Sequence, residues 1–123
     1  MDNKEFGFYL EKRTKKFAMS IIKLSSLLPN TIEFNIIKHQ LIRSGTSIGA
    51  NYREANTSRS RADFINRIKI CQSETNETLY WLELVEESQA NTNEMTINIL
   101  KEAGELMALF TSIISKIRSK NHQ

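Results

Sequence analysis

Residues 44–55 read SGTSIGANYREA and place two glycines, Gly45 and Gly49, four residues apart. The segment lies within a longer stretch, about 31–56, whose apolar residues recur with the period of an α-helix. A glycine inside a helix costs about 1 kcal/mol relative to alanine. We therefore expect both glycines to allow close approach of a neighbouring backbone. A phosphate-binding loop is the less favoured alternative, because no Lys-Ser/Thr pair follows the glycines.

The rest of the chain has few positions at which a helix can end. It contains 123 residues with one proline and four glycines. Pro29 ends the first apolar-periodic stretch, and Ser60 with Asp63 three residues later is typical of a helix N-cap. Helices are expected at about 3–28, 31–56, 60–88 and 94–118. No strand-like alternation competes, so the sequence predicts an all-α, up-down-up-down antiparallel four-helix bundle that forms one domain, 1–123.

Each expected helix carries an apolar stripe that we assign to the core. In the first two helices the inward positions are Leu10, Thr14, Phe17, Ile21, Leu24, Leu28, Phe34, Ile37, Leu41, Ile48 and Ala55. In the third they are Phe64, Ile68, Cys71, Thr75, Thr78, Leu82 and Val85. In the fourth they are Met95, Ile99, Ala103, Phe110, Ile113 and Ile117, with Met107 and Ile114 alongside.

The third helix also carries apolar residues opposite its core stripe. Ile70, Trp81 and Leu84 fall within about 60° of one another on the helical wheel, and Tyr80 lies beside them. Scattered exposed apolar residues are ordinary. A cluster that includes aromatic residues is instead typical of a protein interface, so we expect this face to form an oligomer contact.

Chemistry that would support an enzyme is not visible in the sequence. Di-iron bundles need Glu-x-x-His pairs, and neither His39 nor His122 has a glutamate three residues before it. Cys71, the one cysteine, lies on the apolar stripe of its helix, where a cysteine usually acts as a small hydrophobic residue. We expect no catalytic residue, no metal site, no cofactor and no enzymatic activity.

Hydropathy and cysteine content favour a cytoplasmic protein. The longest strongly apolar uncharged stretch, residues 106–115, is shorter than the roughly 20 residues that span a membrane. The basic N-terminal region lacks the apolar segment and cleavage site of a secretory signal. A single cysteine cannot form an intrachain disulfide and suits a reducing compartment. We expect no membrane partner.

Basic side chains are unevenly distributed, although the net charge is only +3. They gather on the outer face of the first helix and around the loop between the second and third helices. The candidate nucleic-acid contacts are Lys12, Arg13, Lys15, Lys16, Arg53, Arg59 and Arg61. Arginine is well suited to phosphate because of its forked geometry. The competing interpretation is a solvated, salt-bridged surface, because no known nucleic-acid-binding motif is present.

The second and third helices resemble a known family. The motif runs over residues 44–55, continues at Ser60, residues 63–65 (DFI) and Lys69, and ends with residues 77–84 (ETLYWLEL). These segments are similar to the four helix bundle protein family, which includes proteins encoded by intervening sequences in bacterial 23S rRNA genes, also labelled S23 ribosomal proteins. They are also similar to the accessory variability proteins of diversity-generating retroelements.

The resemblance implies a homopentameric ring of four-helix bundles. For the retroelement relatives it also implies binding of RNA or DNA and partnership with a reverse transcriptase. Asn51 and Glu54 match the family motif and share one helix face. Together with Gly45 and Gly49 we assign them a structural role, with Asn51 and Glu54 in a polar network at a bundle or subunit boundary.

Two functional hypotheses follow from the sequence. The first is a homo-oligomeric protein, pentameric by resemblance, that binds nucleic acid weakly through its basic surface. The second is a scaffold that binds another protein and has no nucleic-acid contact. Phosphate binding weakens steeply with salt whereas an apolar interface does not, so salt dependence separates the two.

Overall fold

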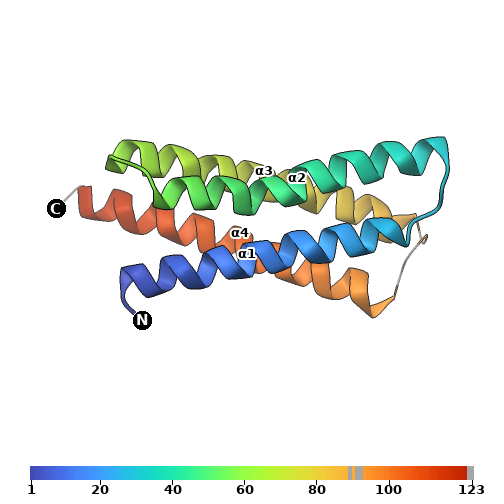
Figure 1. Ribbon diagram of the computed structural model, residues 1–123, viewed down its shortest axis with the longest axis horizontal. Helices are drawn as coiled ribbons and strands as arrows, with labels where there is room; N and C mark the ends of the chain where they lie inside the picture. Colours follow the sequence, from blue (N-terminus) through green and yellow to red (C-terminus); the bar gives the residue numbers. More distant parts are fainter. Residues whose placement is uncertain (89, 91–92, 122–123) are drawn as a thin grey trace.

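The computed structural model describes residues 1–88, 90 and 93–121, and it confirms the predicted all-α fold. Four helices follow one another: α1 (Asn3–Ser26), α2 (Ile32–Asn56), α3 (Arg61–Glu87) and α4 (Glu94–Asn121). Neighbouring helices run antiparallel, and the start of α1 and the end of α4 lie at the same end of the bundle as the loop between α2 and α3 (Figure 1). No strand occurs within these described ranges.

Side-chain caps define where three of the helices begin. Asp2 accepts a hydrogen bond from the Glu5 backbone N–H at 2.7 Å. Thr31 accepts one from Phe34 at 3.1 Å, and Ser60 accepts one from Asp63 at 3.1 Å. The Ser60 cap is the one expected from the sequence. Each cap satisfies a backbone donor that the first helical turn leaves without a partner.

The predicted stripes of α1, α2 and α3 point into a common core. Buried apolar residues come from all four helices and form one cluster, and Tyr52 packs against Phe110 there with ring centroids 6.1 Å apart. Buried hydroxyls on these stripes donate to the carbonyl one turn earlier. Thr75 bonds Cys71 O and Thr78 bonds Glu74 O, each at 2.7 Å. These two hydroxyls therefore enter the core with a partner, whereas the buried Ser25 hydroxyl of α1 has none among the described residues.

The predicted stripe of α4 is confirmed at Ile99, Ala103 and Phe110, and it differs in the last turns of the helix. Leu106 and Ile114 are buried, whereas Ile113 and Ile117, which the sequence places inside, are half-buried. The last turns of α4 thus turn part of their apolar surface away from the core.

The two glycines of α2 lie against α1, where the nearest atoms to Gly45 are side-chain carbons and those near Gly49 include the Thr14 backbone. A Cβ built on Gly45 would lie 2.9 Å from side-chain carbons of Ile21, and one on Gly49 would lie 3.1 Å from the Thr14 hydroxyl. Real Cβ atoms do not approach neighbours as closely as 2.9 Å. The missing side chains therefore set the spacing between α1 and α2.

Candidate functional site

The predicted lysines of α1 lie on its outer face. Lys12, Lys15 and Lys16 are exposed, on the side of the helix opposite its buried residues. The Lys12 ammonium lies 5.6 Å from the centroid of the exposed Phe8 ring, a cation–π arrangement. This face thus combines three cations with an aromatic side chain.

Arg13 occupies a different position from its lysine neighbours. Its Nε and Nη2 donate to the two carboxylate oxygens of Glu102 on α4, at 2.7 and 2.6 Å. The Glu105 carboxylate lies 3.7 Å from the same guanidinium. The hydrogen bonds to Glu102 raise the pKa of Arg13, so the guanidinium stays charged. Arg13 therefore joins α1 to α4 through a two-pronged ion pair.

The predicted arginines lie near the loop between α2 and α3. Arg53, Arg59 and Arg61 are all exposed. The Arg53 Nε lies 3.6 Å from the Glu11 carboxylate on α1. This contact places Arg53 against α1 one residue before Lys12, with an acidic side chain between the two basic regions. We call their exposed members the basic surface: Lys12, Lys15, Lys16, Arg53, Arg59 and Arg61.

The predicted interface residues of α3 are only partly covered. Ile70 and Tyr80 are 40% and 55% exposed, and Trp81 and Leu84 are half-buried. The Tyr80 and Trp81 rings meet edge to face with centroids 5.1 Å apart. We call these four residues the α3 outer face.

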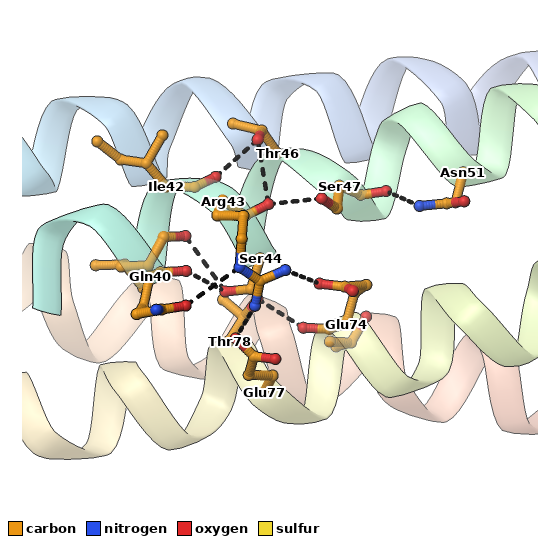
Figure 2. A network of polar contacts seen from close by, with 12 residues as sticks. Gln40, Ile42, Arg43, Ser44, Thr46, Ser47, Asn51, Glu74, Glu77 and Thr78 are labelled. Atoms are coloured by element: carbon orange, nitrogen blue, oxygen red, sulfur yellow. Dashed lines mark hydrogen bonds and ion pairs between the residues drawn. The ribbon is translucent and has the colours of Figure 1, made fainter. Parts of the chain in front are cut away.

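A polar network borders this face and was not foreseen from the sequence (Figure 2). Arg43 of α2 pairs with Glu77 and donates to Glu74 at 3.3 Å, both on α3. The Trp81 indole N–H donates to Glu77 at 3.1 Å. This hydrogen bond, followed by the one from Arg43, lowers the pKa of Glu77. The network fixes the orientation of Trp81 and joins it to α2.

Asn51 lies further along the same seam between α2 and α3. Its amide donates to Ser47 O at 2.9 Å, and its oxygen accepts from Arg67 at 3.0 Å. The Glu54 carboxylate is exposed, and within the described ranges no side-chain hydrogen bond or ion pair involves it. A polar network that includes Glu54 would therefore need a second copy of the chain, and its role stays a prediction.

One further apolar site on α2 was missed by the sequence reasoning. Ile32 and Ile36 are 80% and 58% exposed. Because α2 and α3 are antiparallel, Ile36 and Leu84 both lie seven residues from the Arg43–Glu77 pair in the same direction. Two helical turns separate each from that pair. The α3 outer face therefore has an apolar neighbour on α2. The four-residue spacing of Ile32 and Ile36, about one helical turn, is the sequence signal that could have revealed it.

The cysteine and the histidine of the described residues lie on different helices. Cys71 is buried, and burial raises the pKa of its thiol to about 12, which keeps it protonated at neutral pH. His39 is exposed on α2, and His122 lies outside the described residues. No group of three or more metal-binding side chains occurs in the part of the chain that was described. None of its helices is long and apolar enough to cross a bilayer.

Comparisons with known proteins extend over most of the chain. A family model for the 23S rRNA-intervening sequence protein matches residues 10–112. Among solved structures, the chain is similar to a protein with unknown function from the S23 ribosomal protein family of Bacteroides thetaiotaomicron. The two are 42% identical, with a TM-score of 0.78, over 85% of this chain and 96% of the other. No curated protein matches the chain.

Proposed function

The chain belongs to the 23S rRNA-intervening sequence protein family, and from this membership we propose that it is a non-enzymatic, homo-oligomeric nucleic-acid-binding protein of the cytoplasm. We assign it five copies in a ring. The observation that carries the proposal is the basic surface, whose six cationic side chains on α1, the end of α2, the following loop and the start of α3 are all exposed. Exposed cations in such a cluster attract phosphate regardless of sequence.

Self-association would raise the affinity of the weakly charged basic surface for nucleic acid. Each chain has a net charge of +3, so one copy attracts nucleic acid weakly. Several copies held in one assembly contact the same strand together, and their combined affinity exceeds that of a single copy by orders of magnitude. The α3 outer face supports self-association, because Tyr80 leaves apolar surface in solvent beside Trp81 and Ile70 does so further along the same helix.

Salt-dependent binding to RNA and DNA oligonucleotides tests the proposal. Fluorescence anisotropy with labelled single- and double-stranded oligonucleotides is expected to show affinity falling steeply between 50 and 200 mM salt, as phosphate contacts require. Lys16→Glu is expected to weaken binding on the order of tenfold, because every copy in the assembly loses the contact. Lys101→Glu, an exposed α4 lysine outside the basic surface, is the matched control and should bind as the unaltered protein does.

A protein-binding scaffold is the second candidate, and the apolar α3 outer face with the exposed Ile36 favours it. The scaffold requires no phosphate contact. If the protein binds none of the oligonucleotides at 50 mM salt, or if Lys16→Glu and Lys101→Glu bind equally well, the nucleic-acid proposal is wrong and the scaffold remains.

A further inference from the structure

A cavity opens at the end of the bundle where α1 begins and α4 ends. Its volume is about 560 Å³, and side chains from all four helices line it. The apolar walls include Phe6 of α1, Phe64 of α3, and Ile113 and Ile117 of α4. All four side chains are half-buried, so the core is not closed here. We call this space the terminal cavity.

The cavity has a fixed floor. Tyr52 lines it and is 2% exposed, held by its contact with Phe110. Asn56 beside it donates to the Glu11 carboxylate at 2.9 Å and to Gly7 O at 3.4 Å. Gly7 permits this approach, since a Cβ there would lie 3.3 Å from the Asn56 amide nitrogen. These contacts hold the surrounding helix ends in place without a ligand.

The charged side chains among the described residues that line the cavity are all positive. Lys116 and Lys120 come from successive turns of α4, four residues apart on one face. Among the described residues that line the cavity, none is an aspartate or a glutamate. The remaining polar groups are the neutral side chains of Asn3, Tyr52, Asn56 and Ser112. An anionic group is therefore favoured at this rim, and a cationic one is not.

We propose that the terminal cavity binds a small amphipathic anion, a carboxylate with an aliphatic body. The body lies among the half-buried side chains of α1, α3 and α4, and the carboxylate pairs with Lys116 and Lys120. The volume lies in the range of roughly 300–1,000 Å³ that small-molecule sites occupy. No residue of the basic surface lines the cavity, so this site is separate from the proposed nucleic-acid contact.

Calorimetric titration of the full chain with decanoate tests the proposal. We expect saturable binding and a raised melting temperature, because a ligand of the folded state stabilises it. Decanol, which lacks the charge, is expected to bind on the order of tenfold more weakly, and decylammonium is expected not to bind. Equal affinity for decanol and decanoate, or no saturable binding of decanoate, overturns the proposal.

Two pairs of variants place the binding in the cavity. Ser112→Trp fills the space from an exposed position on its wall, and Ser115→Trp places the same side chain at an exposed position that does not line the cavity. Ser112→Trp should abolish decanoate binding while Ser115→Trp retains it. Lys116→Gln with Lys120→Gln should weaken decanoate about tenfold and leave decanol unchanged, whereas Lys101→Gln should change neither. Decanoate binding that survives Ser112→Trp in a folded protein contradicts the assignment.

Discussion

Gly45 determines how closely α1 and α2 pack. Its missing side chain leaves room for Ile21, which is fully buried and whose carbons would lie 2.9 Å from an added Cβ. Gly45→Ala is therefore expected to lower the free energy of unfolding by about 1–2 kcal/mol, since overpacking outweighs the better helix propensity of alanine. Urea unfolding followed by circular dichroism measures the change.

Gly104 provides the matched control for that prediction. It is exposed on α4, and a Cβ there would meet nothing within 4 Å. Gly104→Ala is expected to raise the free energy of unfolding by up to about 1 kcal/mol through helix propensity alone. Equal effects of the two substitutions would contradict the close-packing account of α2.

The Arg13–Glu102 ion pair joins α1 to α4 in a half-buried position. The side chains are 21% and 29% exposed, and the geometry is two-pronged. Glu102→Gln is expected to cost about 1 kcal/mol of unfolding free energy, because Arg13 loses a charged partner. Glu105→Gln should cost less, since Glu105 is 55% exposed and 3.7 Å away. Thermal unfolding of both variants at one salt concentration tests the order.

Within α3, the pairing of Glu77 with Trp81 and Arg43 predicts a pH dependence. The lowered pKa of Glu77 means that its contribution is present above the unfolded pKa of about 4.3 and is lost as the pH falls through the lower, folded value. Glu77→Gln should therefore lower the free energy of unfolding at pH 7. Below about pH 4, the free energy of unfolding of this variant should fall less steeply than that of the unaltered protein. Urea unfolding from pH 7 to 3 measures this. Glu83→Gln, exposed on the same helix, should leave the slope unchanged.

The helices differ in how far their sequence determines their orientation. In α1 the apolar stripe from Leu10 to Leu24 has a charged face opposite it, so periodicity alone identifies the buried side. In the second half of α4 apolar residues cover about 160° of the wheel, from Leu109 to Met107. Either edge of this apolar arc can then face the core. The structure selects Leu106 and Ile114, and Ile113 turns to the terminal cavity.

Side-chain contacts between residues far apart in the chain could not be predicted from the sequence either. The basic run of α1 reads as one charged face, yet Arg13 meets Glu102 across 89 positions while Lys12 and Lys16 stay exposed. The i and i+4 relation of Glu77 and Trp81 could have been recognised from helix geometry alone. Their joint pairing with Arg43 needed the register of α2 against α3, which no local pattern supplies.

Over the whole molecule, charge is separated along the bundle. Residues 74–105 carry eight acidic side chains and one lysine, whereas residues 107–121 carry Lys116, Arg118 and Lys120 and no acid. The basic corner at Arg59 lies at the same end as the start of α1 and the end of α4 (Figure 1). The acidic region of one copy attracts the basic end of another copy, and this attraction favours an ordered assembly over aggregation.

The α3 outer face is expected to hold that assembly together. Ile70→Asp places a charge on the helix face that Trp81 shares, about three turns away, and should reduce the assembly to single chains because the carboxylate would lose its hydration in the interface. Ile97→Asp changes an apolar residue of α4 that is 54% exposed and should leave the assembly intact. Sedimentation velocity compares the two. If Ile70→Asp stays assembled while Ile97→Asp dissociates, the interface lies on α4 and not on the α3 outer face.

The absolute mass of the purified protein tests the central claim most directly. Light scattering on a sizing column, with absorbance recorded at 260 and 280 nm, reports assembly size and bound nucleic acid together. The account predicts about 71 kDa, five chains of 14.2 kDa each, with co-eluting nucleic acid that high salt removes. A peak at 14.2 kDa with no absorbance excess at 260 nm would contradict both the assembly and its proposed role.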